Sequence, residues 1–99
     1  MQTAYDPTEA LLAIPAEALP GEPGLWRPLR AVCAALRIAD SRWAARQIPQ
    51  EHKRRVYKFR RGYRSTAYTY TDLTGVEALL ILRARVPRSA VLDALRAGE

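Results

Sequence analysis

The chain has 99 residues, of which 48% are hydrophobic, and a formal net charge of +6. This length allows one domain with a small core, and no apolar run approaches the roughly eighteen residues of a membrane-spanning helix. The single cysteine, Cys33, excludes an internal disulfide and a cysteine zinc cluster. Because the first residues show neither a basic segment nor a continuous apolar run, we expect no secretory signal and an intracellular, reduced protein.

The charge is unevenly distributed along the chain. Residues 1–25 contain four acids and no base, for a net charge of −4, whereas residues 26–99 contain all sixteen bases and six acids, for +10. Fourteen of the bases are arginine, whose planar guanidinium matches phosphates and guanine edges. The basic part of the chain therefore favours a polyanionic partner or an acidic protein surface.

The N-terminal quarter contains few periodic signals. We expect a flexible N-terminus at 1–9 and one domain at 10–99. The apolar run "ALLAIPAEAL" (10–19) is interrupted by Pro15, which makes it at best an edge strand. The segment "PGEPG" (20–24) predicts a turn, because glycine supplies positive φ and proline fixes its own φ.

Two helices are expected next, at 28–37 and 41–48. Apolar residues of the first recur at helical spacing: Leu29, Val32, Cys33 and Leu36. Asp40 or Ser41 can cap the second helix, and Pro49 ends it. The short connection fits a helix-turn-helix with Arg42 and Arg46 exposed, but two core-packing helices anchored by Trp26 and Trp43 are the favoured interpretation.

Residues 51–65, "EHKRRVYKFRRGYRS", contain seven Lys or Arg among fifteen residues. With the following "TAYTYT" they predict two strands around a turn at Arg61-Gly62, because Val, Tyr, Phe and Thr are strand formers and glycine interrupts them. Period-two alternation puts most of the charge of the first strand on one face and Tyr57 and Phe59 on the other.

After the hairpin the apolar period becomes helical. Thr74 and Glu77 form a candidate capping box. A wide apolar face follows, typical of a core helix: Leu73, Val76, Leu79, Leu80 and Leu82. A last short helix begins after Pro87 and ends at Gly98. The whole order predicts an α+β fold, a small single domain with a basic β-hairpin packed on about four short helices.

The residue types that catalysis needs do not gather in this sequence. His52 has only Glu51 nearby to orient it, and Cys33 lies on an apolar helical stripe, where a small core residue is expected rather than a nucleophile. The acids are scattered, and no glycine-rich phosphate loop or metal-ligand cluster is present. We therefore expect no enzyme, no cofactor and no metal site.

Two segments resemble the BRO-N domain, the N-terminal module of baculovirus repeated proteins and of many phage antirepressor-like proteins. "GEPGLWRPLRAVCAALRI" is similar to the family's "GEPW" turn and "DVCxALG" helix. "YTDLTGVEALLILRARVPRSAVLDAL" looks like its "INESGLYRLILRSRKPEAKAF" segment. The matching positions are Gly21, Glu22, Pro23, Trp26, Val32, Cys33, Ala35, Leu36, Gly75, Leu79 to Leu82, Arg83, Arg85 and Pro87. The resemblance covers roughly residues 10–98.

The chain also departs from the family pattern. Ala31 replaces the acid of "DVC", and Arg37-Ile38 replaces the glycine after that helix. Asp72 is displaced by one place from the family's acidic residue, and Arg61-Gly62 stands where the hairpin usually has two glycines. The resemblance implies an α+β, DNA-binding viral or prophage protein. Members usually carry a C-terminal second domain, so we expect this one to act alone or to be a shortened version.

We predict a nucleic-acid-binding surface on the hairpin, with DNA favoured over RNA. Its candidate contacts are Lys53, Arg54, Arg55, Lys58, Arg60, Arg61, Arg64, Tyr57 and Tyr63. The two tyrosines are candidates for stacking on bases, although aromatic residues of strands more often pack in the core. A secondary basic cluster comprises Arg83, Arg85, Arg88, Arg42 and Arg46. The competing interpretation is a solvated ribbon whose charges discourage edge pairing.

A second hypothesis assigns the same basic face to a protein partner. The chain would then be an inhibitor of a host or phage repressor, polymerase or defence nuclease, docking on an acidic patch. The acidic residues 1–25 would oppose DNA binding only if they lay beside the hairpin. We expect no membrane partner, leave a homodimer open, and expect the cytoplasm of a bacterial host or virus-infected cell, at the nucleoid if DNA is bound.

Overall fold

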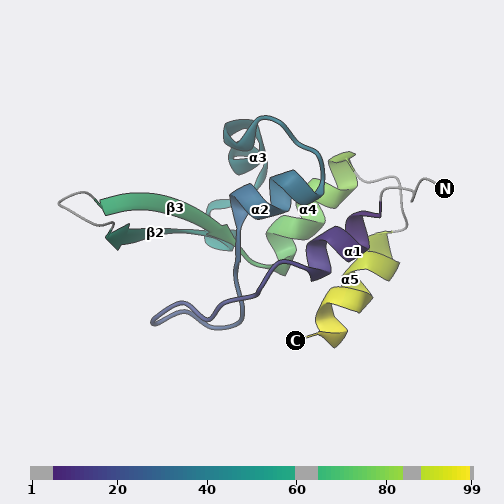
Figure 1. The fold of residues 1–99 in the computed structure, drawn as a ribbon, viewed down its shortest axis with the longest axis horizontal. Helices are drawn as coiled ribbons and strands as arrows, with labels where there is room; N and C mark the ends of the chain where they lie inside the picture. The colour runs from purple at the N-terminus through teal and green to yellow at the C-terminus, as the bar shows by residue number, and fades with distance from the viewer. Residues whose placement is uncertain (1–5, 60–64, 84–87, 99) are drawn as a thin grey trace.

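A computed structural model describes residues 6–59, 65–83 and 88–98. It confirms the predicted α+β fold. Its elements are α1 (Pro7–Leu12), β1 (Arg27–Pro28), α2 (Leu29–Ala35), α3 (Ser41–Gln47), the 3-10 turn η1 (Gln50–His52), β2 (Lys53–Phe59), β3 (Ser65–Thr71), α4 (Leu73–Arg83) and α5 (Arg88–Ala97). The helices gather at one end, and the ribbon of β2 and β3 extends away from them (Figure 1).

The N-terminal segment is helical where the sequence predicted an edge strand. The side chain of Asp6 caps α1 by accepting a hydrogen bond from the backbone N–H of Thr8 (2.9 Å), and Pro7 takes the first helical position. Leu11 is fully buried. The strand prediction was wrong for residues 10–12, which belong to α1, because Pro15 lies beyond the end of this helix. Further along the same apolar run, Glu17 forms an isolated antiparallel bridge with Trp26. Residues 7–9, assigned to a flexible N-terminus, belong to this helix.

Helices α2 and α3 both contribute to the main core, as the favoured interpretation predicted. Trp43 packs against this core, but Trp26 belongs to a second cluster on the sheet, so its expected anchoring role was wrong. The buried members of the main core come from all five helices and the segments beside them: Leu11, Leu29, Val32, Cys33, Ala35, Leu36, Ile38, Ala44, Ile48, Val76, Leu79, Leu80, Val91, Leu92 and Leu95.

Helix α4 is a core helix with a different cap from the predicted one. Asp72, not Thr74, caps it: its Oδ1 accepts a hydrogen bond from the backbone N–H of Gly75 (3.0 Å). The predicted apolar face is buried at Val76, Leu79 and Leu80. Leu82 is 49% exposed, because it lies in the last turn of α4, beyond the core.

The sheet has the order β1-β3-β2 and is antiparallel. β2 pairs with β3 along its whole length, from Lys53 opposite Thr71 to Phe59 opposite Ser65. β1 pairs only with the last two residues of β3, Tyr70 and Thr71. Because β2 pairs with β3 alone, β2 is an edge strand of the described sheet. The turn predicted at Arg61-Gly62 lies outside the described residues.

Residues 15–26 form a loop that packs on the ribbon, here called the acidic loop. Its ends are joined by two 2.7 Å backbone hydrogen bonds between Glu17 and Trp26. Gly21 and Gly24 have φ of 75° and 78°, as the predicted turn requires. Leu19, Trp26 and Tyr70 form the second cluster, with Val56 and Tyr68 packed beside it.

Among the helices of the described residues, none is long and apolar enough to cross a membrane.

Candidate nucleic-acid interface

The ribbon has two faces whose environments differ. Residues directly opposite each other in an antiparallel pair lie on the same face, and successive residues alternate between faces. The loop face therefore carries Arg54, Val56, Lys58, Tyr68 and Tyr70, and it packs against the acidic loop. The open face carries Lys53, Arg55, Tyr57, Ala67 and Thr69.

Arg54 is held on the loop face by several groups. Its Nε lies 2.9 Å from Oε1 of Glu22, and its guanidinium lies 5.0 Å from the centre of the Trp26 ring. Its Nη1 also donates to the backbone carbonyls of Glu51 (3.0 Å) and Lys53 (2.8 Å). The hydrogen bond with Glu22 raises the pKa of Arg54 above its ordinary value. These contacts make Arg54 a bridge between the ribbon and the acidic loop.

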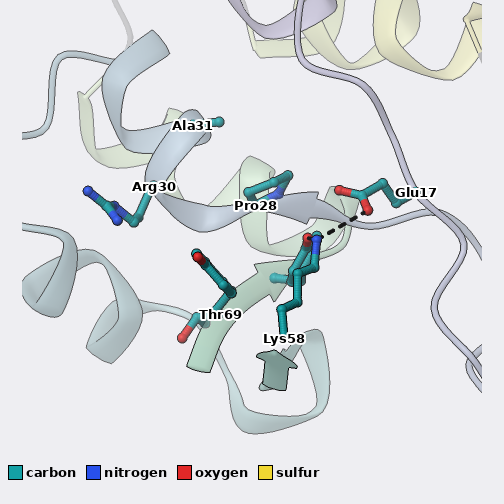
Figure 2. Close-up of a pocket in the computed structure, with 8 residues that line it drawn as sticks. Glu17, Pro28, Arg30, Ala31, Lys58 and Thr69 are labelled. Atoms are coloured by element: carbon teal, nitrogen blue, oxygen red, sulfur yellow. Dashed lines mark hydrogen bonds and ion pairs between the residues drawn. The ribbon is translucent and has the colours of Figure 1, made fainter. Parts of the chain in front are cut away.

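Lys58 has a similar role nearer the ribbon's tip. Its Nζ donates a 2.7 Å hydrogen bond to the hydroxyl of Tyr70, lies 5.3 Å from the centre of the same ring, and is 3.8 Å from Oε1 of Glu17 (Figure 2). The hydrogen bond to Tyr70 raises the pKa of Lys58, and the carboxylate of Glu17 adds to this effect. The positive charge of the ammonium is therefore partly balanced by the carboxylate of Glu17, although the Lys58 side chain is half exposed.

The acidic loop consequently lies beside the hairpin, which the sequence left undecided. The strand register places Arg54 and Lys58 on the opposite face from Tyr57, as predicted. However, Lys53 and Arg55 share the face of Tyr57, so the described charges of β2 divide equally between the faces, and the predicted concentration of charge on one face is wrong for these residues. The two described cations of the loop face, Arg54 and Lys58, each lie against an acid of the N-terminal segment. The charge count alone overstates how much positive potential this face offers a phosphate.

The open face is less neutralised. Arg55 is exposed, and Tyr57 has 63% of its surface exposed. Lys53 donates a 2.6 Å hydrogen bond to the carbonyl of Ala45 in α3, which attaches the base of the ribbon to that helix. An ammonium has three N–H donors, so this bond leaves two of them for other acceptors.

Two hollows lie between the ribbon and the helices, the first beside α3 and η1 and the second beside α2 and α3. One, of about 220 Å³, is lined in part by Lys53, Arg54 and Arg55, and the other, of about 200 Å³, in part by Arg30 and Arg42. Ala45 and Thr69 line both hollows. Five bases and no acid therefore line this part of the described surface.

Arg30 is a candidate contact that sequence reasoning missed. It is exposed in the first turn of α2, and it also lines a larger hollow of about 460 Å³ on the side of Glu17 and Lys58 (Figure 2). The available signal was its position two residues after Pro28 and off the apolar stripe. The sequence could not show that pairing of Pro28 with Tyr70 brings this turn of α2 against β3.

The other predicted contacts are dispersed. Arg42 and Arg46 are exposed one turn apart on α3. Arg83 lies 5.1 Å from the ring centre of Trp43, and Arg88 begins α5, at the other end of the molecule from the ribbon (Figure 1). Outside the described residues lie Arg60, Arg61, Tyr63, Arg64 and Arg85.

His52 has a carboxylate partner that the sequence did not indicate. Its Nδ1 lies 2.8 Å from Oδ2 of Asp72, whose other oxygen caps α4. The carbonyl of His52 accepts hydrogen bonds from the hydroxyl of Thr71 (3.0 Å) and the backbone N–H of Asp72 (3.3 Å). This network joins η1 to the start of α4, so its evident effect is structural.

Cys33 is 3% exposed, in agreement with the expected core position. Burial raises the pKa of its thiol, and the negative charge of Asp40 adds to this effect. Within the described ranges, no three His, Cys, Asp or Glu side chains are grouped so that they could hold a metal ion.

Comparisons of the chain with protein-family models, curated proteins and solved structures gave no match. The resemblance to the BRO-N domain therefore stays a prediction from the sequence motifs.

Proposed function

We propose that this protein is a small DNA-binding regulator of the antirepressor-like type, and that the open face of its ribbon holds the nucleic acid. The observation that carries the proposal is the pair of hollows between ribbon and helices, which no acid lines among the described residues. Four of the five bases that line them are Arg30, Arg42, Lys53 and Arg55, and the fifth, Arg54, is paired with Glu22. Phosphates contribute binding energy where cations are not already neutralised. This condition favours the open face over the loop face.

Two further features support a regulator rather than an unspecific basic surface. Arg55 and Arg42 come from different elements, so the fold brings cations together that the sequence separates. The motif resemblance to BRO-N independently implies DNA binding. The proposal changes the predicted contact set: Arg30 joins it, while Arg54 and Lys58 serve mainly to hold the acidic loop.

The salt dependence of DNA binding tests this assignment. If three cations contact phosphates, log K falls with log salt with a slope of about −2.7, which is a roughly 40-fold loss between about 50 and 200 mM salt. Fluorescence anisotropy with a labelled DNA hairpin that carries a single-stranded tail measures this slope without presuming the form of the site. The Arg42→Ala, Arg55→Ala double variant should reduce the slope by up to about 1.8.

A matched control removes the same charge elsewhere. Arg88 and Arg96 are exposed on α5, which packs against α1 and α4. Arg88→Ala with Arg96→Ala should leave the slope close to the wild-type value. Absence of binding overturns the proposal, and an equal loss of slope in both double variants overturns the assignment to the open face.

The protein-partner hypothesis predicts a different result from the same variants. A pull-down from nuclease-treated lysate would then retain one stoichiometric protein, and Arg42→Ala with Arg55→Ala would release it. That result, together with no detectable DNA binding, would replace the proposed function by the inhibitor hypothesis.

A further inference from the structure

The side chain of Tyr57 is largely exposed and is not part of either hydrophobic cluster. It is 63% exposed, whereas Tyr70 on the neighbouring strand is 2% exposed. Lys58 lies over the rings of both Tyr68 and Tyr70 on the loop face. Directly across the strands from Tyr57 stands Ala67, a single methyl group that cannot cover a phenol ring. The sheet thus presents a large planar side chain to solvent.

The cations of the open face flank this ring. Arg55 is two residues away on the same strand and therefore on the same face. Beyond it, towards the helices, lie the two hollows with Arg30, Arg42 and Lys53 in their walls. An aromatic platform followed by a line of cations is the arrangement by which proteins bind a single strand, with bases stacked and backbone phosphates neutralised.

Each of the two hollows is too small to enclose a whole ligand. Volumes of about 200 and 220 Å³ lie below the roughly 300 Å³ of pockets that enclose a whole small ligand. Each hollow can therefore hold only part of a ligand, such as one phosphate group or one base.

The acidic loop makes a duplex less suitable than a single strand. A two-stranded ribbon that enters the major groove, about 12 Å wide, has phosphate backbones on both sides. Here one side of the ribbon carries Glu17 and Glu22, which would face one of those backbones. A single strand can contact the open face without approaching these carboxylates.

From these observations we infer that the open face selects single-stranded nucleic acid, with an unpaired base stacked on Tyr57. The flat face of a base is accessible only where the base is not enclosed in a helical stack, so stacking on Tyr57 requires unpaired nucleotides. This inference rests on the proposed function and names the form of nucleic acid that the site takes.

The test compares a labelled single-stranded 20-mer of mixed sequence, a length of the order of the single-strand site sizes of binding proteins, with the same sequence as a duplex. The single strand should bind more tightly. Tyr57→Ala should weaken single-strand binding about 5- to 150-fold and leave duplex binding unchanged. Tyr57→Phe, which keeps the planar ring, should restore single-strand binding, whereas Tyr57→Leu, which keeps only apolar bulk, should not.

The outcomes separate this inference from the proposed function. Equal binding of single strand and duplex, or Tyr57→Ala with no effect on the single strand, overturns the inference, while a salt slope that depends on Arg42 and Arg55 upholds DNA binding on the open face. Rescue by Tyr57→Leu also overturns stacking. Failure of both nucleic acids to bind overturns the two together. Because Tyr57 is exposed, its variants are expected to unfold thermally like the wild type.

Discussion

Arg37 adopts a backbone conformation that is usually reserved for glycine. Its φ is +56°, in the left-handed region. The backbone N–H groups of Arg37 and Ile38 donate to the carbonyls of Ala34 (3.2 Å) and Cys33 (2.8 Å), which is the Schellman arrangement at the end of α2. The BRO-N pattern has a glycine after this helix, where the present chain has Arg37. The cap of α2 is therefore formed by an arginine, which adopts the left-handed conformation at a steric cost that glycine does not have.

Arg37→Gly is predicted to stabilise the protein. The substitution removes the steric cost of the left-handed conformation but adds freedom to the unfolded chain, so we expect a gain of up to about 1 kcal/mol in the free energy of unfolding. Urea unfolding monitored by circular dichroism measures it. Gly24→Ala, at φ of 78°, is the converse control and should destabilise. A loss of stability in Arg37→Gly would contradict the predicted strain.

Gly75 is constrained by space and not by its backbone angle. A Cβ at this position would collide with the hydroxyl oxygen of Thr71 and come within 3.1 Å of a methyl group of Ile48. Gly75→Ala should therefore cost about 1–3 kcal/mol, the usual range for overpacking. Gly98→Ala is the control, because its nearest neighbour would be an ordinary 3.6 Å away. Equal thermal unfolding of the two variants would show that the close approach at Gly75 is not maintained.

At the scale of elements, the acidic loop decides which side of the ribbon can meet a polyanion. Glu22 contacts Arg54 and Glu17 lies near Lys58, so two acids lie against two of the ribbon's described bases. These acids precede the ribbon by about thirty residues or more in the sequence. Their effect on binding can be separated from that of the open face by substitution.

Glu17→Gln with Glu22→Gln is predicted to strengthen nucleic-acid binding. The change frees Arg54 and Lys58 for phosphates, so the slope of log K against log salt should steepen by up to about 1.8. Glu9→Gln with Asp93→Asn makes the same change in net charge on α1 and α5 and should have a smaller effect. If both pairs of substitutions act equally, binding depends on total charge and not on the acidic loop.

The elements also show what the sequence could predict. Apolar periodicity was sufficient for α2, α4 and α5, because each buries a repeating apolar pattern. Helix α3 followed from its capping residue and Pro49, and the two long strands followed from their strand-forming residues. Periodicity failed for α1, six residues long, whose apolar run fits helix and strand equally. Alternation assigned Arg54 and Tyr57 to opposite faces correctly. Which face is covered depends on contacts between residues distant in sequence, and local patterns do not contain that information.

At the scale of the whole molecule, Cys33 reports on global unfolding. Burial and the charge of Asp40 raise the pKa of its thiol, so the folded state disfavours the reactive thiolate. A thiol reagent at about pH 8 should react only as fast as the protein unfolds, and at once in denaturing urea. Rapid reaction of the native protein would contradict this burial.

The same raised pKa has a defined effect on stability. An unfolded cysteine ionises near pH 8.5, whereas Cys33 in the folded protein ionises only at higher pH. The stabilisation that comes from the neutral thiol is therefore fully present below about pH 8.5. It is lost as the pH rises from there through the higher pKa of the folded state, because ionisation favours the unfolded state. Cys33→Ala should show a smaller decline in the free energy of unfolding above about pH 8 than the wild type.

The register between β2 and β3 determines more than the hydrogen bonds of the ribbon. A slip of one residue would move every side chain of a strand to the opposite face, without any change in composition or net charge. Arg55 and Tyr57 would then point towards the acidic loop, and Arg54 and Lys58 would point away from it. The contacts of Glu22 with Arg54 and of Glu17 with Lys58 form only in the observed register. The two carboxylates thus favour one strand alignment over the others. The insertion of one uncharged residue in β2 would move the proposed binding surface to the other face while leaving the chain's charge intact.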